Sequence, residues 1–189
     1  MQMYKTKVIN LYGGPSTGKS TTAAGVFHNF KMDKIRCELV REFVKDWAYD
    51  GKKIERRHQI KLFAEQADRE GCVYGKVEWV VTDSPLILCE IYEKRYFGEA
   101  TMTAGLYERW LELNKDVIEP LHIKIIRSKE YDAVGRYETQ DQAIEMDTII
   151  TERVQELCLK TNQILYIVNY DTAIEEIRAI CLGTHLKES

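Results

Sequence analysis

Residues 13–20 of this 189-residue chain read Gly-Gly-Pro-Ser-Thr-Gly-Lys-Ser and match the pattern GxxxxGK[ST] in full. Glycines let the backbone curl into a cup whose N–H groups point at phosphate oxygens. The amine of Lys19 can reach the β- and γ-phosphates of a nucleotide, and the hydroxyl of Ser20 can bind Mg²⁺. The pattern therefore predicts a site for ATP and Mg²⁺. The residues expected to contact the nucleotide are Gly13, Gly14, Ser16, Thr17, Gly18, Lys19, Ser20 and Thr21.

The segments on either side of this loop have the character that a phosphate site requires. Residues 8–12 (Val-Ile-Asn-Leu-Tyr) are rich in strand-forming types, and residues 19–30 have the pattern of a helix. A loop between a strand and a helix places phosphates at the helix N-terminus, where the helix dipole is positive. The alternative interpretation is a glycine-rich turn before a helix with a surface lysine.

A carboxylate follows a second apolar segment. Residues 77–82 (Val-Glu-Trp-Val-Val-Thr) predict a strand, and Asp83 comes directly after it. Ligands of parallel α/β sheets bind outside the carboxyl ends of the strands. Asp83 is therefore a candidate to hold Mg²⁺ together with Ser20, or to accept a proton from an attacking hydroxyl. A cap of the next helix or turn is the alternative role for this residue.

Charged side chains also lie at the end of a short strand predicted at residues 35–40. A carboxylate of Glu38 or Glu42 could orient a substrate hydroxyl at this position. The planar guanidinium of Arg41 could bind a phosphate or a carboxylate. We take Glu38 and Arg41 as candidate site residues, and a solvated helix start with Glu42 favoured by the helix dipole is the alternative.

A polar, basic segment that contains one glycine follows the next strand and leads into a long helix. In phosphoryl transfer, charge develops on phosphate oxygens, so arginines on a closing segment suit the reaction. Closure would also exclude water from the site. We predict a lid at about residues 127–141, with Arg127 and Arg136 as catalytic phosphate contacts. An ordinary exposed loop is the alternative.

The remaining apolar periodicity predicts the fold. Further strands are expected at residues 121–126 and 165–168, and further helices at 42–49, 55–70, 103–117, 139–159 and 172–182. Strands that alternate with helices indicate βαβ units. We therefore expect a single α/β domain over residues 1–189, with a mostly parallel five-stranded sheet covered by helices on both faces.

The composition limits the classes of function. The formal net charge of -3 argues against a surface that is basic throughout, as a general nucleic-acid binder would have. The apolar stretches fall short of a membrane span, and the N-terminus lacks the apolar core of a signal peptide. The five scattered cysteines and four histidines show no disulfide or metal spacing. We expect a cytoplasmic protein whose oligomeric state the sequence does not specify.

A local basic segment at residues 51–61 could nevertheless steer a phosphorylated or polymeric substrate, or it could be a solvated helix face. In the helix predicted there, Gln59 and Gln66 are seven residues apart and hence lie near one face. Their amides could read the edge of a base or a sugar, or they could face water.

The chain resembles the ribosylnicotinamide-kinase-like group of P-loop kinases and ATPases, many of which are encoded by bacteria and their phages. The resemblance extends over most of the chain. The segments that carry it are the phosphate loop GGPSTGKST, residues 38–43, residues 81–85, and residues 135–138 together with 143–147. The resemblance implies a nucleoside/nucleotide-kinase core that uses ATP and Mg²⁺. It implies Asp83 near the metal or the acceptor, Glu38 and Arg41 near the acceptor, and Arg127 and Arg136 in a lid.

Three functions remain open from the sequence. The first is transfer of the γ-phosphoryl group of ATP to a nucleoside or nucleotide. The second is the same chemistry on a hydroxymethylated pyrimidine base in DNA, as in viral P-loop kinases that the chain also resembles. The third is a regulatory ATPase without a small-molecule acceptor. Members that act on nicotinamide riboside carry an additional adenylyltransferase half, for which we expect no room in this chain.

Overall fold

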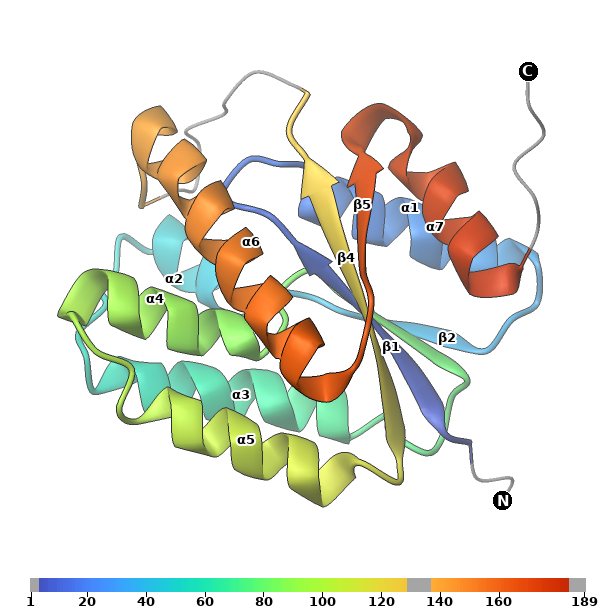
Figure 1. The fold of residues 1–189 in the computed structure, drawn as a ribbon, viewed down its shortest axis with the longest axis horizontal. Coiled ribbons are helices and arrows are strands. Elements are labelled where there is room, and N and C mark those ends of the chain that lie inside the picture. Colours follow the sequence, from blue (N-terminus) through green and yellow to red (C-terminus); the bar gives the residue numbers. More distant parts are fainter. Residues whose placement is uncertain (1–3, 129–136, 184–189) are drawn as a thin grey trace.

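The computed structural model describes residues 4–128 and 137–183. Within these residues, five strands form one sheet in the order β2-β3-β1-β4-β5 (Figure 1). The strands are β1 (Thr6–Tyr12), β2 (Cys37–Val40), β3 (Trp79–Thr82), β4 (Ile118–Ile126) and β5 (Leu165–Asn169). Every pairing between neighbouring strands is parallel. The predicted α/β fold with a parallel five-stranded sheet is confirmed.

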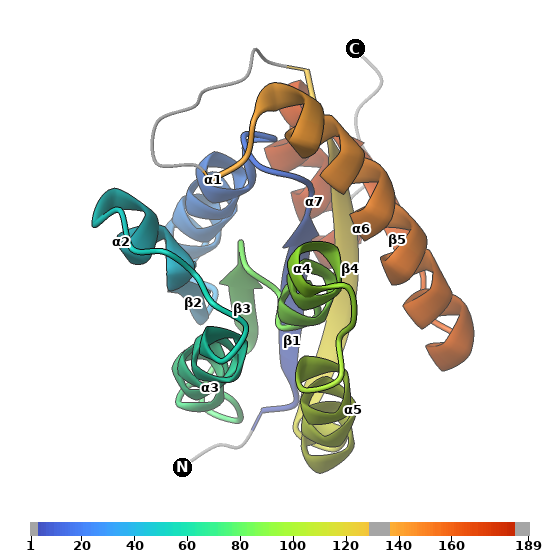
Figure 2. The same ribbon diagram turned by 90° about the vertical axis from the view of Figure 1, so that its left-hand side faces the viewer.

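Helices cover both faces of this sheet (Figure 2). One face packs against α1 (Lys19–Met32) and α7 (Ala173–Leu182). The other face packs against α3 (His58–Gly71), α4 (Ile87–Phe97), α5 (Thr103–Asn114) and α6 (Gln140–Thr161). The short helix α2 (Val44–Tyr49) follows β2, and a 3₁₀ turn, η1 (Tyr170–Thr172), follows β5.

The alternation of side chains along β1 explains the two layers. Ile9 and Leu11 are fully buried in the core under α1 and α7, together with Phe30. Tyr12 belongs to the core on the opposite face, with side chains of α3, α4 and α6. Since successive strand residues point to opposite faces, a strand covered on both sides must be apolar throughout. This requirement explains the apolar character of residues 8–12.

β4 begins earlier than the sequence predicts and includes Pro120. A proline has no N–H and is normally excluded from a central strand. Here β5 pairs with β4 only from His122 onwards, so Pro120 lies where β4 has β1 as its one neighbour. The missing N–H therefore interrupts no ladder between β4 and β5.

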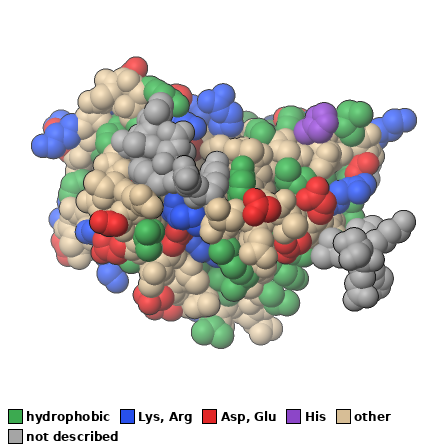
Figure 3. Space-filling model, turned by 90° about the horizontal axis from the view of Figure 1, so that it is seen from above, with side chains coloured by type: hydrophobic (Ala, Val, Ile, Leu, Met, Phe, Trp, Pro, Cys, Tyr) green, Lys and Arg blue, Asp and Glu red, His purple; other side chains and the backbone are tan. Residues whose placement is uncertain are grey.

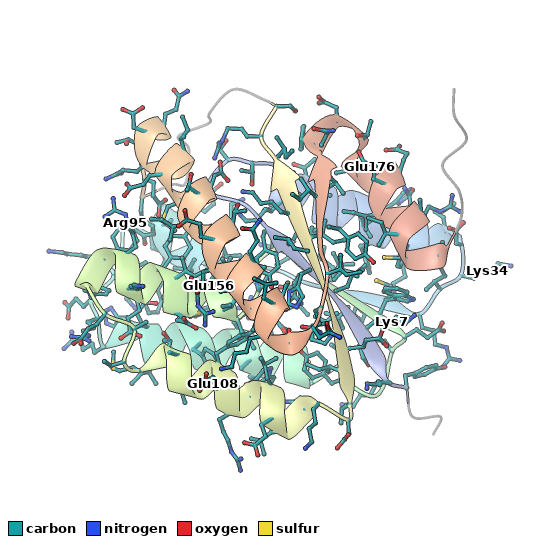
Figure 4. All side chains as sticks on the ribbon, viewed as in Figure 1. Lys7, Lys34, Arg95, Glu108, Glu156 and Glu176 are labelled. Atoms are coloured by element: carbon teal, nitrogen blue, oxygen red, sulfur yellow. The ribbon has the colours of Figure 1, made fainter. Side chains whose placement is uncertain are left out.

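Helix α4 is missing from the sequence predictions. Its sequence places apolar and charged side chains around the whole circumference, without a clear amphipathic stripe. Two of its charged residues form ion pairs with α6. Glu90 binds Arg153 at 2.7 Å, and Arg95 binds Glu145 at 2.6 Å. Arg95 is labelled in Figure 4. Buried Glu93 accepts hydrogen bonds from Thr103 at the start of α5. Apolar side chains of α4, among them Ile87 and Ile91, pack with Ile150 of α6 in the core, and the ion pairs add charged contacts beside them.

The carboxyl ends of β1, β3 and β2 lie at one edge of the sheet, because these strands are parallel neighbours. Figure 3 looks down on the molecule from above this edge and shows acidic and basic side chains interspersed on the visible face. Within the described residues, no helix has the length and apolar character needed to cross a membrane.

Candidate active site

The phosphate loop forms the predicted turn between β1 and α1. Ser16 and Gly18 both adopt left-handed backbone conformations, with φ values of 62° and 91°. A left-handed Ser16 is unusual for a residue with a side chain, and such conformations concentrate at functional sites. At Gly18 a side chain is also excluded by space, because an added Cβ would contact the ring of Tyr170 in η1. The backbone of this loop has the alternating form of an anion-binding nest.

The N-terminus of α1 is suited to a phosphate. Its first turn contains no acidic residue, and no side chain caps its free N–H groups. An uncapped helix start attracts an anion through its N–H groups and its dipole. Of the predicted contacts in this turn, Ser20 is half-buried and Thr21 is exposed.

Lys19 lies over the loop. Its ammonium group donates hydrogen bonds to the carbonyl oxygens of Gly13 at 2.7 Å and Gly14 at 3.0 Å. Thr17 also donates to the Gly14 carbonyl, at 3.0 Å. The lysine is therefore held at the mouth of the loop, where its charge can act on phosphate oxygens.

A charged cluster joins the loop to α6 and β4. The carboxylate of Asp147 accepts hydrogen bonds from the Gly14 N–H at 2.7 Å, from Lys124 at 2.7 Å and from Arg127 at 2.9 Å. Space is tight here, since a Cβ on Gly14 would contact the carbonyl oxygen of Ala143. One carboxylate thus connects the phosphate loop, the centre of β4 and the first residue of the predicted lid.

Two cations against one carboxylate leave this cluster positively charged. Burial lowers the pKa of Lys124 from its ordinary value, while Asp147 opposes that shift. Burial would raise the pKa of Asp147, but Lys124, the Gly14 N–H and Arg127 outweigh burial and hold it below its ordinary value. Among the described residues, Nη1 of Arg127 is buried and has no hydrogen-bond partner.

Asp83 lies directly after β3, as predicted, and is only 4% exposed. Its Oδ1 accepts a hydrogen bond from the Glu42 N–H at 2.9 Å, which ties the segment after β2 to the end of β3. Its Oδ2 makes no hydrogen bond within the described residues. Ser20 and Asp83 follow neighbouring strands and fit Mg²⁺, which takes few protein ligands besides water and phosphate oxygens. No group of three or more His, Cys, Asp or Glu that could hold a metal occurs in the described part of the chain.

Of the charged candidates Glu38, Arg41 and Glu42 in and directly after β2, only Glu42 lines the site. Glu38 lies inside β2 and pairs with Lys31 in the last turn of α1 at 2.9 Å, at the opposite end of that helix from the loop. Arg41 is exposed and is not among the residues that line the pocket described next. The structure instead brings Glu42 to the site, because two further residues carry the chain past the sheet edge.

A pocket of about 370 Å³ opens beside the phosphate loop. Its size suits a small-molecule ligand. Lys19 and Ser84 line the end next to the loop, and Glu42 and Lys53 also face it. The remaining walls come mainly from Phe43, Val44 and Ala48 around α2, Gln59, Leu62 and Gln66 of α3, and Leu88, Cys89, Tyr92 and Tyr96 of α4.

The segment after the predicted lid also reaches this pocket. Tyr137 and Glu138 line it, and the Tyr137 hydroxyl donates to the Lys52 carbonyl at 2.7 Å. Thr139 then caps α6 through a capping box with Gln142. Residues 129–136 of the predicted lid, with Arg136, lie outside the described residues.

Several site residues escaped prediction. Asp147 occurs in a segment that carried the family resemblance, yet no local pattern indicates that it accepts a hydrogen bond from the phosphate loop. The only sequence signal for Lys124 is one cation within the apolar strand His-Ile-Lys-Ile-Ile. Tyr92 and Tyr96 of α4, which form aromatic walls of the pocket, were not predicted because the helix itself was not predicted.

The chain matches the AAA domain family over residues 8–172. No curated protein matches it. Among solved structures, it is similar to deoxyadenosine kinase from M. mycoides with the products dCMP and a flexible dCDP bound. That match has a TM-score of 0.62 and 15% identity, and it covers 94% of this chain and 100% of the kinase.

The chain is also similar to NadR protein in complex with NR, with a TM-score of 0.66 and 15% identity. This match covers 97% of the chain but 52% of NadR, so the chain spans about half the length of that protein. At this identity, the likeness to both structures is one of fold. The chain belongs to the AAA domain family and has the P-loop fold of nucleoside kinases.

Proposed function

We propose that this protein is an ATP- and Mg²⁺-dependent kinase that transfers the γ-phosphoryl group to a hydroxyl of a nucleoside or nucleotide. The observation that carries the proposal is the pocket of about 370 Å³ that shares Lys19 with the phosphate loop. A nucleotide in the loop and an acceptor in the pocket would then meet at this lysine. Such a juxtaposition supplies the positioning on which phosphoryl transfer depends.

On the ATP side, the loop N–H groups and the start of α1 hold the phosphates. Lys19 neutralises charge on the β- and γ-phosphates, and Ser20 and Asp83 would hold Mg²⁺, which offsets the charge of the transferred group. Arg127 supplies its Nη1, which has no hydrogen-bond partner among the described residues. In this proposal, Arg136 adds a second arginine from the predicted lid.

On the acceptor side, the carboxylate of Glu42 faces the pocket. It orients the acceptor hydroxyl and takes its proton while the oxygen bonds to the γ-phosphorus and the bond to ADP breaks. Asp83 fixes the backbone of Glu42 through the 2.9 Å hydrogen bond. In this proposal Asp83 has the metal role and Glu42 has the role of base.

The fold of the protein favours acceptors with a nucleoside part. The two similar structures are described with dCMP and dCDP, and with NR. These ligands make nucleosides and nucleotides the first acceptors to test.

A phosphorylated or polymeric acceptor is a second candidate, and the lysines of the pocket favour it. Lys45 and Lys53 both line the pocket, and cations there could bind a phosphate of a nucleotide or of DNA. A modified pyrimidine in single-stranded DNA would then be the acceptor. Binding that falls steeply with added salt would favour the polymer over the free compound.

The proposal is tested by incubating the purified protein with labelled ATP, Mg²⁺ and a panel of nucleosides, nucleotides and oligonucleotides with hydroxymethylated pyrimidines. We expect transfer of label to one acceptor class and loss of nearly all transfer in Lys19→Ala. Lys31→Ala, at the other end of α1, is the matched control and should keep full activity. Hydrolysis of ATP that no acceptor stimulates would instead support the regulatory ATPase.

A further inference from the structure

One wall of the pocket presents two buried amides on the same face of α3. Gln59 is 3% exposed and Gln66 is 2% exposed, and both line the pocket with Leu62 between them. Residues spaced by three and four lie on one helix face. Glutamine is rarely buried without partners, because a buried amide loses its hydrogen bonds to water and is destabilising unless other groups replace them.

The orientation of Gln66 is set from behind the pocket. Its Nε2 donates to Thr82 Oγ1 at 3.3 Å and lies 3.5 Å from Glu70 Oε1. Glu70 is held in turn by the Tyr74 hydroxyl at 2.6 Å. With Glu70 ionised, this orientation gives the carboxylate and the Thr82 hydroxyl oxygen a donor, whereas the reversed amide would place Oε1 against the carboxylate. The amide nitrogen therefore points away from the pocket.

The other end of this amide has no partner. Oε1 of Gln66 is fully buried and makes no hydrogen bond within the described residues. The side-chain amide of Gln59 likewise makes no hydrogen bond in the described part of the chain. A buried amide oxygen that lines a pocket calls for a hydrogen-bond donor on whatever occupies that pocket.

The surrounding walls indicate the shape of that occupant. Phe43, Tyr92 and Tyr96 contribute aromatic surface, and Leu62 and Leu88 contribute aliphatic surface. The rings of Tyr92 and Tyr96 stack with an interplanar angle of 15°. Flat apolar walls with polar groups at one edge suit a planar heterocycle.

We propose that this pocket binds a nitrogen heterocycle of the nucleobase class, and that Gln66 selects it by accepting a hydrogen bond from a ring N–H or amino group. Gln59, about two helical turns away on the same face, offers a second donor and acceptor to the same ring edge. The inference rests on the proposed function, since the ring would belong to the phosphoryl acceptor. It adds that specificity resides in α3 rather than in the phosphate loop.

The test measures binding to the intact protein by calorimetry without ATP. Deoxyadenosine and deoxycytidine are compared with analogues that lack the exocyclic amino group, and thymidine is compared with its N3-methyl derivative. For the nucleoside that binds, we expect removal of the donor to weaken binding by about tenfold or more. Equal affinity for each nucleoside and its donor-free analogue, or no binding by any nucleoside, would overturn the proposal.

Substitutions in α3 test whether Gln66 is the residue that discriminates between these ligands. Gln66→Met keeps the volume but removes the acceptor, so the protein should lose its preference for the donor-bearing ligand. Gln59→Met serves if Gln66→Met fails to fold, because Gln59 has no internal hydrogen bond to lose, and it should also weaken binding. Gln155→Met, on the exposed face of α6, is the matched control. A folded Gln66→Met protein with unchanged discrimination would contradict the role of this residue.

Two further comparisons separate the possible outcomes. The same ring offered as a nucleoside, a 5′-monophosphate and a short single-stranded oligonucleotide identifies the source of the base by the tightest binding. Transfer of phosphate only to an acceptor without a heterocycle would refute this inference and the nucleoside acceptor, but would leave phosphoryl transfer itself standing. Nucleobase binding without transfer to any acceptor would support the inference and refute the kinase function.

Discussion

The backbone N–H of Gly14 donates to Oδ1 of Asp147 at 2.7 Å, which joins the second residue of the phosphate loop to the first half of α6. The same oxygen accepts from Lys124 at 2.7 Å. The loop is therefore held by a carboxylate 133 residues away in the sequence. Because the other oxygen of Asp147 binds Arg127, this carboxylate links the first residue of the predicted lid to the loop.

Asp147→Asn should destabilise the protein by about 1–3 kcal/mol at neutral pH, since it leaves Lys124 and Arg127 partly buried without a counter-charge. The carboxyl pKa is lowered by folding, so this stabilisation is complete above the ordinary value and is lost as the pH falls through the lowered one. Urea unfolding at several pH values measures the difference between wild type and variant. It should shrink towards about pH 3, and a difference that grows in acid would contradict the assignment.

Asp83→Asn should lower kcat about 100-fold or more while ATP affinity stays largely intact, because the lost charge weakens the hold on Mg²⁺. The asparagine oxygen can still accept the hydrogen bond from the Glu42 N–H, so the local backbone should persist. Steady-state kinetics and calorimetric ATP binding separate the two effects. Asp33→Asn, at the far end of α1, is the control. Lost ATP binding with normal turnover would show that the metal role is wrong.

Glu42→Gln and Glu38→Gln form a matched pair. Glu42 lines the pocket, whereas Glu38 pairs with Lys31 away from it. We expect kcat to fall about 100-fold in Glu42→Gln, the size of a general-base contribution, and to stay near wild type in Glu38→Gln. The pH profile of kcat should lose its acidic limb in the first variant only. A larger loss of kcat in Glu38→Gln than in Glu42→Gln would show that Glu38 is the base.

Because the pKa of Glu70 is raised in the folded state, we expect the protein to lose stability as the pH rises. Burial raises its pKa from 4.5 to about 7, although hydrogen bonds from Tyr74, Gln66 and Thr82 oppose the shift. Between these two values the folded state binds more protons than the unfolded state, so the free energy of unfolding falls by about 3 kcal/mol as the pH rises through this window. Glu70→Gln should remove that slope. Denaturant melts between pH 4 and 8 test this, and parallel curves for the two proteins would refute it.

The strand, loop and helix around Lys19 and the position of Asp83 were predictable because each rests on a local pattern. The loop motif fixes its neighbours within a few residues, and Asp83 follows an apolar segment directly. The parallel order of the sheet then brings these two strand ends together. Local patterns also placed most helices to within a few residues.

The remainder of the site depends on contacts between distant segments. The bond between Gly14 and Asp147, and the pocket between α3 and α4, arise only when helices pack on the sheet. The sequence also could not distinguish Glu38 from Glu42. Only the exact end of β2, at Val40, shows that Glu38 lies within the strand and that Glu42 reaches the pocket. In α4, charged residues are interspersed among the apolar ones without a clear stripe, and only the packing against α6 shows which side chains form the core.

Tyr170, in the 3₁₀ turn after the last strand, fills the space behind Gly18. A nascent chain that has left the ribosome only as far as α6 therefore still lacks the back wall of its nucleotide cradle. The phosphate loop is therefore complete only after Tyr170 has been synthesised and has packed behind Gly18. Two segments far apart in the sequence must close on each other before ATP can be held firmly.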